Sequence, residues 1–155
     1  MRVTLNALFA MEAVMNPMLA PTRSTGERHG EPPVRVLVAE PNPLLRDSIQ
    51  DAFESAGLDV MTASDGGEAI DLARRLRFDV VLSDVQLPDL AGTDVARAVK
   101  AEADSPIVLL LSRWPPRPEL VREAARAGAA RVVSDPIVPS ALARTVRRLA
   151  DGEAA

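Results

Sequence analysis

The sequence has no cysteine, a single histidine and very few aromatic residues, and each shortage argues against a class of function. Without cysteine there are no disulfides, no thiolate metal sites and no cysteine nucleophile. The single histidine, His29, lies in a polar stretch far from any other candidate site residue, which argues against a histidine-based triad or a zinc site. Aromatic residues make up only 3% of the chain, too few for platforms that stack bases or flavins.

Long apolar runs are also missing, so we expect no membrane span and a cytoplasmic location. The first twenty residues faintly resemble a signal peptide, but Asn6 and Glu12 interrupt their apolar stretch. The net charge of −4 gives no electrostatic reason to expect nucleic-acid binding. A length of 155 residues with 47% hydrophobic residues suits one globular domain.

The composition divides the chain into three parts. Residues 21–33 are rich in proline, glycine, serine and charge, so we expect residues 1–33 to be a disordered leader. A start of translation at Met11, Met15 or Met18 is an alternative explanation of this segment. The folded domain is then expected over residues 34–150, with residues 151–155 as a tail.

From Val34 onward, short β-branched runs alternate with amphipathic stretches. The runs that predict strands are 34–39, 58–63, 78–83, 106–112 and 130–134. The stretches that predict helices are 43–56, 66–76, 92–103, 118–128 and 139–150. Such strict alternation predicts an α/β fold, a doubly wound five-stranded parallel sheet of the flavodoxin-like (βα)5 type with strand order 2-1-3-4-5.

In this topology a ligand binds at the carboxyl ends of the strands, beside the switch point between strands 1 and 3. Glu40, Asp84 and Asp135 each follow a strand, and the Ser112 hydroxyl ends another, so we expect these four residues to converge. Close carboxylates repel one another unless a cation intervenes, and Mg²⁺ prefers oxygen ligands. A carboxylate beside such an ion can attack a phosphoryl group and form an acyl phosphate.

The segment FDVVLSDVQLPDLAGTDV (78–95) resembles the response-regulator receiver domains of two-component signalling. VLVAEPNPLLR (36–46), LDVMTASDGGEAIDLAR (58–74), PIVLLLS (106–112) and AGAARVVSDP (127–136) resemble other parts of that family in the same order and spacing. The likeness covers about residues 34–150. It implies a stand-alone receiver in a phosphorelay, a signalling switch rather than an enzyme, that takes its phosphoryl group from a sensor histidine kinase or a phosphotransfer protein.

Carried over residue by residue, the resemblance makes Asp84 the phosphoacceptor and Ser112 the hydroxyl that contacts the phosphoryl group. It makes Glu40, Asp84 and the backbone carbonyl of Gln86 the ligands of Mg²⁺. Asp135 is a further candidate ligand.

Three positions depart from the family pattern. Pro41 stands where a second acidic residue is usual, Asp135 replaces the usual lysine, and Val132 replaces an aromatic residue. Losing a cation beside a phosphoryl group commonly costs about 1.5–3 kcal/mol, which corresponds to roughly one to a few powers of ten in rate. A rival interpretation therefore stays open: a pseudo-receiver, which uses the same fold as a phosphorylation-independent interaction module.

Two features of the last third of the chain suggest partner binding. Arginines are frequent there: Arg113, Arg117, Arg122, Arg126, Arg131, Arg144, Arg147 and Arg148. They indicate either a face for a downstream partner or a homodimer, formed by the fourth helix, fifth strand and fifth helix, or a solvated and partly paired surface. Trp114, in a proline-rich loop after Ser112, is either an anchor for a partner or a residue that packs back on the domain.

Overall fold

The computed structural model describes residues 30–153, in which strands and helices alternate without exception. The strands are β1 (Arg35–Ala39), β2 (Asp59–Ala63), β3 (Val80–Asp84), β4 (Ile107–Ser112) and β5 (Arg131–Ser134). The helices are α2 (Pro43–Ser55), α3 (Gly66–Arg75), α4 (Gly92–Lys100), α5 (Pro118–Arg126) and α6 (Pro139–Ala150). Most of the leader expected over residues 1–33 lies outside the described residues, which begin at residue 30. Residues 154–155 of the expected tail also lie outside them.

The five strands form one parallel sheet in the order β2-β1-β3-β4-β5, which confirms the predicted fold class and strand order. Ala39 at the end of β1 pairs with Ser83 of β3. The next residues along these two strands are Glu40 and Asp84, so the register brings both carboxylates to the same level of the sheet edge. The pairing of two strands thus places the candidate site.

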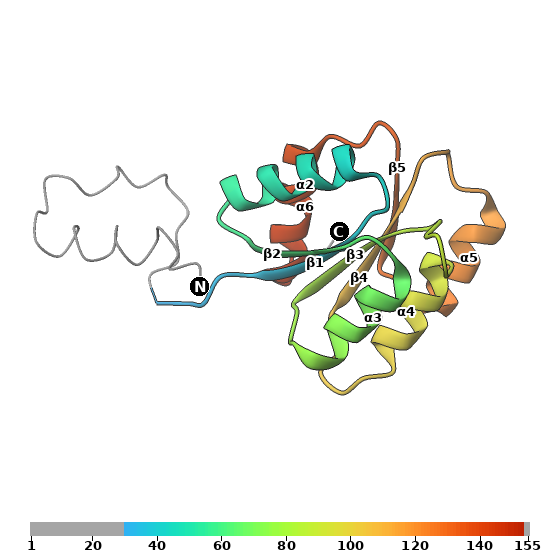
Figure 1. Cartoon of the computed structure of the whole chain (residues 1–155), viewed down its shortest axis with the longest axis horizontal. Helices are drawn as coiled ribbons and strands as arrows, with labels where there is room; N and C mark the ends of the chain where they lie inside the picture. Colours follow the sequence, from blue (N-terminus) through green and yellow to red (C-terminus); the bar gives the residue numbers. More distant parts are fainter. Residues whose placement is uncertain (1–29, 154–155) are drawn as a thin grey trace, which may run out of the picture. The chain divides into compact units, whose positions relative to one another are not determined.

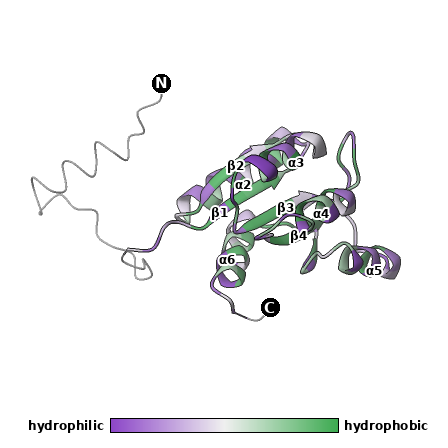
Figure 2. Cartoon of the chain, turned by 90° about the horizontal axis from the view of Figure 1, so that it is seen from below, coloured by the Kyte–Doolittle hydropathy of each residue, from purple (hydrophilic) through white to green (hydrophobic). Residues whose placement is uncertain are grey.

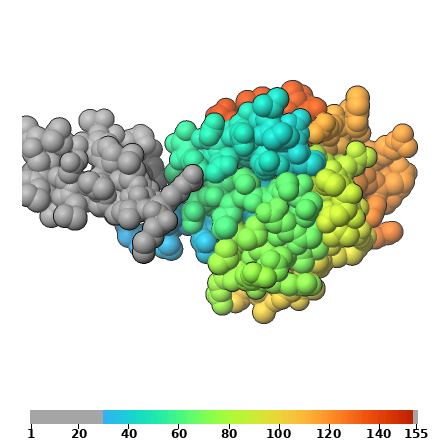
Figure 3. Space-filling view, in the orientation of Figure 1, coloured from blue at the N-terminus to red at the C-terminus, as the bar shows by residue number. Residues whose placement is uncertain are grey.

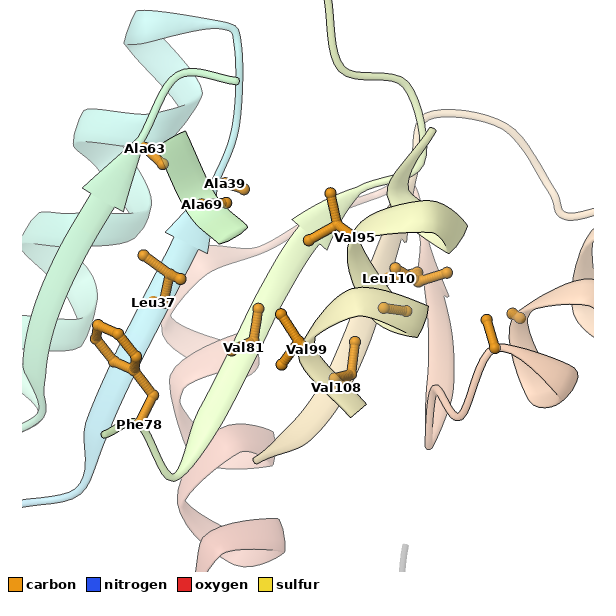
Figure 4. Close-up of a cluster of buried hydrophobic side chains, with 13 residues drawn as sticks. Leu37, Ala39, Ala63, Ala69, Phe78, Val81, Val95, Val99, Val108 and Leu110 are labelled. Carbon is orange, nitrogen blue, oxygen red and sulfur yellow. The ribbon is translucent and has the colours of Figure 1, made fainter. Parts of the chain in front are cut away.

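Helices cover both faces of the sheet (Figure 1). Helices α2 and α6 cover one face, where Val36, Val38, Ile49, Phe53 and Val146 belong to one buried cluster. Helices α3, α4 and α5 cover the other face, where Leu37 and Val81 of the sheet meet Val95 and Val99 of α4 (Figure 4). Alternate residues of one strand therefore enter different cores, as the two-residue period of a strand requires.

The central strands are apolar along their whole length because both of their faces are buried. All five residues of β3 are buried, and so are the last five residues of β4. In Figure 2 these strands are coloured as hydrophobic, whereas the helices also carry hydrophilic residues. In the space-filling view, the cyan, green and yellow segments that include α2, α3 and α4 form much of the visible surface (Figure 3). None of the helices within residues 30–153 is long and apolar enough to cross a membrane.

The predicted boundaries agree with the observed ones to within two residues, except at the end of α4. This helix was expected to reach residue 103 and ends at Lys100. The chain then turns at Asp104, which has a positive φ of 55°, and Pro106 leads into β4. A proline disfavours helical geometry in the residue before it, so the approach to β4 requires a break that the apolar periodicity does not reveal.

The two outer strands are short and carry charge. Strand β2 has five residues and β5 has four, and Asp59 and Arg131 at their starts are exposed. The Nε atom of Arg35 lies 3.1 Å from Oδ2 of Asp59, so an ion pair ties β2 to its neighbour β1. Short strands with charged residues are features that discourage pairing with a foreign strand.

Gly92, the first residue of α4, is required by a close approach of two backbones. A Cβ atom at this position would lie 2.3 Å from the backbone oxygen of Asp84 and 2.9 Å from Cα of Val85. The Gly92 amide also donates a hydrogen bond to the Val85 carbonyl at 3.0 Å. The start of α4 is therefore fixed directly against the residue that ends β3.

We predict that Gly92→Ala lowers the free energy of unfolding by about 1–3 kcal/mol, the usual cost of overpacking. Replacing a glycine in an open helix by alanine would instead stabilise it by up to about 1 kcal/mol. Urea unfolding of both proteins, followed by circular dichroism, gives the sign. A stabilised variant would show that α4 can move away from Asp84 without cost.

Candidate functional site

Two carboxylates, those of Glu40 and Asp84, lie buried at the carboxyl edge of the sheet. Glu40 has no exposed surface and Asp84 is 3% exposed. Each follows directly from its strand: Asp84 is the last residue of β3, and the Glu40 amide extends the pairing of β1 by donating to the Ala63 carbonyl. Burying two like charges together is unfavourable without compensation, so the groups around them decide the chemistry of the site.

The turn after β1 holds the backbone and one carboxylate oxygen of Glu40. Oε1 accepts a hydrogen bond from the Asn42 amide at 2.8 Å, and Arg46 Nη1 donates to the Glu40 carbonyl at 2.9 Å. Asn42 is also the N-cap of α2, because its side-chain oxygen accepts from the Leu44 amide at 3.0 Å. The other carboxylate oxygen of Glu40, Oε2, is buried and has no hydrogen-bond partner.

The two carboxylate oxygens of Asp84 have different surroundings. Oδ1 accepts a hydrogen bond from the Gln86 amide at 2.8 Å, which fixes the orientation of the carboxylate. Oδ2 faces Arg113, whose Nε atom lies 3.9 Å away. One oxygen is therefore held by the backbone, and the other faces the half-exposed guanidinium of Arg113.

Arg113 connects the two acidic residues electrostatically. Its Nη2 atom lies 3.6 Å from Oε1 of Glu40, while its Nε atom faces Asp84. The arginine side chain is 50% exposed, whereas those of Glu40 and Asp84 are 0% and 5% exposed. The sequence analysis placed Arg113 only among the arginines of a partner-binding or solvated surface. Its position directly after Ser112, at a strand end, is the signal that could have linked it to the site.

Burial is the main cause that raises the pKa of Glu40 above its ordinary value. The negative charge of Asp84 raises this pKa further, while the Asn42 amide and the Arg113 guanidinium lower it. The net direction is upward, so Glu40 binds a proton more readily than a glutamate in water.

Ser112 ends β4 beside the acidic pair and is 4% exposed. Its hydroxyl donates to the Trp114 carbonyl at 2.7 Å and accepts from the Trp114 amide at 3.3 Å. The hydroxyl therefore closes its own turn and joins β4 to the loop of Trp114, Pro115 and Pro116. The Trp114 side chain does not pack back on the domain, since the residue is 75% exposed.

Asp135 is at the expected strand end, but its side chain is exposed. Its amide donates to the Ser112 carbonyl at 3.1 Å, which places its backbone beside β4. Among the described residues, no three acidic or histidine side chains are close enough to hold one metal ion. The expected convergence thus brings together Glu40 and Asp84, with Ser112 in the adjoining turn, while the carboxylate of Asp135 does not join them in a metal-sized group.

The residues present still fit a hard divalent cation held by few protein ligands. Glu40 offers a buried carboxylate oxygen without a hydrogen-bond partner, and Asp84 offers a second buried carboxylate. Gln86, the expected source of a backbone carbonyl ligand, is held beside Asp84 by the hydrogen bond from its amide to Oδ1. Mg²⁺ commonly binds through one or two carboxylates and keeps several waters. Pro41, between Glu40 and Asn42, has no side-chain oxygen to add.

The loop after β3 is anchored by Asp89, a residue that the sequence analysis did not identify. Its Oδ1 and Oδ2 atoms accept from the amides of Gly66 and Gly67, each at 2.8 Å. These amides belong to the first turn of α3, where helix N–H groups lack internal partners and favour a negative charge. The Gly66 hydrogen bond, followed by that of Gly67, lowers the pKa of Asp89. The carboxylate thereby fixes the loop that leads away from Asp84.

A cavity of about 400 Å³ opens between Asp84 and the start of α5. Its lining includes Ser112, Trp114, Pro116, Leu120 and Glu123. At its border, buried Thr93 of α4 donates its hydroxyl to Glu123 of α5 at 3.0 Å. The cavity thus connects the acidic pair with the proline-rich loop and with α5.

The arginines of the last third do not act as one set. Arg122 pairs with Glu119 at 3.0 Å within α5, and Arg148 lies 3.9 Å from Glu153. Arg147 donates to the Ala56 carbonyl and so caps the end of α2 from α6. Only Arg113 among these four faces the acidic pair. This distribution favours the interpretation of a partly paired surface for the others.

The chain is similar to known proteins in both sequence and fold. The family model described as "Response regulator receiver domain" matches residues 36–147. Among curated proteins, the chain is 44% identical over 80 residues to the probable transcriptional regulatory protein TcrX of Mycobacterium tuberculosis, covering 52% of this chain and 34% of that protein. The chain thus spans about a third of the length of such curated relatives.

Solved structures show the same fold. The chemotaxis response regulator CheY4 of Vibrio cholerae matches with a TM-score of 0.70 at 30% identity, over 76% of this chain and 99% of that chain. The receiver domain of the sensor histidine kinase PA1611 from Pseudomonas aeruginosa, solved with magnesium coordinated in its active-site cleft, matches with a TM-score of 0.69 at 26% identity. That match covers 77% of this chain and 99% of the other.

We predict that Asp89→Asn destabilises the domain at neutral pH and that the difference disappears in acid. The folded pKa of Asp89 lies below its unfolded value, so its contribution is complete above the unfolded pKa of about 3.9. It is lost as the pH falls through the folded pKa. Urea unfolding of both proteins from pH 7 down to pH 3 measures this dependence. Asp51→Asn, at an exposed position of α2, is the matched control, and an equal pH dependence in all three proteins would contradict the anchoring role.

Proposed function

The chain belongs to the response-regulator receiver family, and from that premise we propose that it accepts a phosphoryl group on Asp84. The observation that carries the proposal is the setting of this carboxylate. It is buried at the end of β3, one oxygen is held by the Gln86 amide, and the other faces a cation across the edge of a cavity. A carboxylate fixed in this way is oriented for attack before a donor arrives.

In the proposed transfer, a lone pair on Oδ2 of Asp84 forms a new O–P bond. With a phosphohistidine donor the P–N bond breaks, and its electron pair passes to the imidazole nitrogen, which takes up a proton. The Gln86 amide holds Oδ1 throughout and keeps Oδ2 directed outward. The donor is a sensor histidine kinase or a phosphotransfer protein, as the family membership suggests.

We propose that Glu40, Asp84 and the backbone carbonyl of Gln86 hold Mg²⁺. When bound, the ion would neutralise the charge of the phosphoryl oxygens. The buried and unpartnered Oε2 of Glu40 supports this assignment, and so does the magnesium named for the cleft of the related PA1611 receiver. We leave Asp135 out of the proposed ligand set, because its exposed carboxylate does not form a group with the other two.

Ser112 is the proposed hydroxyl partner of the transferred group. Its Oγ is buried beside the cavity that Asp84 also lines, and it can donate to a phosphoryl oxygen if it gives up the Trp114 carbonyl. Phosphorylation would then change the turn at the start of the loop containing Trp114. The exposed indole ring is well placed to report this change to a partner, since tryptophan is common in interface hot spots.

We propose that the module is a cytoplasmic switch that acts through protein contacts rather than as an enzyme or a direct DNA binder. A net charge of −4 and the pairing of several surface arginines with glutamates support this view. The downstream partner would meet α5, β5 and α6, close to Trp114. A dimer formed through this face belongs to the same proposal.

The rival candidate is a pseudo-receiver that binds partners without phosphorylation. Asp135 in place of a lysine favours this rival, because a carboxylate at that position repels phosphoryl oxygens. Val132, which packs against the core where an aromatic residue is usual, removes the ordinary aromatic switch. The buried and oriented Asp84 favours the phosphoacceptor, since a binding module would gain nothing from burying two acidic groups together.

Intact-mass spectrometry after incubation with acetyl phosphate and Mg²⁺ tests the proposal. We expect one added phosphoryl group on the wild-type protein and none on Asp84→Asn. With this donor, the bond between phosphorus and the bridging oxygen breaks and acetate leaves. Ser112→Ala should reduce the rate by about tenfold, the effect of losing one charge-assisted hydrogen bond worth about 1.5 kcal/mol.

Asp79→Asn, at an exposed position just before β3, is the control for the loss of a carboxylate elsewhere, and it should be phosphorylated like the wild type. A folded wild-type protein that stays unmodified beside a reactive reference receiver would favour the pseudo-receiver.

A further inference from the structure

We propose that Arg113 is a built-in counter-ion of the acidic pair and competes with the divalent cation for the same carboxylates. The proposal rests on the metal site proposed above, but not on phosphoryl transfer to Asp84. In this family a lysine and a metal ion usually share the neutralisation of the acidic residues. Here the Arg113 side chain would neutralise them when no metal is bound. Metal binding would then require the guanidinium to leave the pair.

The geometry of the guanidinium is the first support. Its Nη2 and Nε atoms face different acidic residues, Glu40 at 3.6 Å and Asp84 at 3.9 Å. One planar cation therefore spans both carboxylates, as the rigid fork of arginine allows and the point charge of lysine does not. Both distances exceed a normal hydrogen bond, so the pairing is electrostatic and can be exchanged for another cation.

The position of Arg113 in the chain is the second support. The side chain is half exposed, so it can swing into solvent without disturbing the core. Its backbone follows Ser112, whose hydroxyl closes the turn to Trp114. The arginine is thus carried by a loop fixed at its base, while its long side chain stays free to leave.

The remaining charges around the pair are the third support. Position 135, at the end of β5, carries an exposed aspartate instead of a cation. Arg46 lies near Glu40 but donates to its backbone carbonyl and forms no ion pair with the carboxylate among the described residues. Arg113 is therefore the cation that meets both acidic side chains, and its removal would leave two uncompensated carboxylates for a metal ion to bind.

Titration of Mg²⁺ into the wild type and into Arg113→Gln tests this competition. Trp114 is the only tryptophan of the chain and follows Arg113 directly, so its fluorescence reports on the site without a label. Isothermal calorimetry gives the same dissociation constant independently of the indole ring. We expect Arg113→Gln to bind Mg²⁺ about tenfold more tightly, because the competing positive charge is gone.

Arg117→Gln is the matched control. This exposed arginine belongs to the same loop and lines the same cavity, yet within the described residues it forms no ion pair with Glu40 or Asp84. Its substitution should leave the affinity unchanged. Arg113→Lys keeps the positive charge but loses the planar guanidinium that spans both carboxylates. Its affinity for Mg²⁺ should therefore lie between those of the wild type and Arg113→Gln.

Thermal unfolding supplies a second readout. Arg113→Gln should melt below the wild type without metal, and Mg²⁺ should raise its Tm more than that of the wild type. Unchanged or weaker affinity in Arg113→Gln, equal tightening in Arg117→Gln, or no binding in any variant would each overturn the inference. The mass measurement with acetyl phosphate reads phosphoryl transfer and the titration reads Mg²⁺ binding. A protein that binds Mg²⁺ as expected but takes up no phosphoryl group would contradict the proposed function and leave this inference standing.

Discussion

Two like charges held together out of water are the constraint around which the carboxyl edge of this domain is organised. The parallel register of β1 and β3 brings Glu40 and Asp84 to one level, and the sheet leaves them almost no exposed surface. Each neighbouring loop then contributes a compensating group: the Asn42 amide after β1, the Gln86 amide after β3 and the Arg113 side chain after β4. The three loops differ in sequence, but each places a hydrogen-bond donor or a positive charge beside a buried carboxylate.

The compensation is also linked to the scaffold. Asn42 both donates to Glu40 and caps α2, so the orientation of the acid depends on the start of that helix. Gly92 fits α4 against the backbone of Asp84, and Asp89 ties the loop between them to α3. A shift of the acidic pair would therefore disturb the starts of three helices. The geometry of the acidic pair is therefore held fixed by the scaffold around it.

The fold could be predicted from the sequence because the strands are nearly continuous apolar runs and the helices carry clear stripes. Asp84 could be located in the same way, since it directly follows the most uniformly apolar strand. For Arg113 the sequence offered only its place directly after a strand end, because the contact of its side chain with the two carboxylates depends on a loop conformation that no periodicity records. Asp89 was missed for a similar reason: its partners, the amides of Gly66 and Gly67, are distant in sequence and have no side chains.

Asp135 shows the opposite limit. Its position at the end of β5 suggested a shared metal site, and the strand end is where the topology places it. The residue, however, is exposed, and its carboxylate forms no metal-sized group with the other two. Topology fixes where a strand ends, but the direction of the next side chain depends on the local turn. Counting the carboxylates that follow strands therefore overestimates the number of acidic side chains that lie together in one site.

The charged and short outer strands bear on the behaviour of the domain at the high concentrations inside a cell. A parallel sheet exposes unpaired amides and carbonyls along β2 and β5, which are the places where chains can add to one another and aggregate. Strand β2 has only five residues and β5 only four, and each begins with an exposed charged residue, Asp59 or Arg131. A foreign strand can therefore form few backbone hydrogen bonds at either edge. Any association between copies is then expected to use side chains on the helices rather than the backbone edges of the sheet.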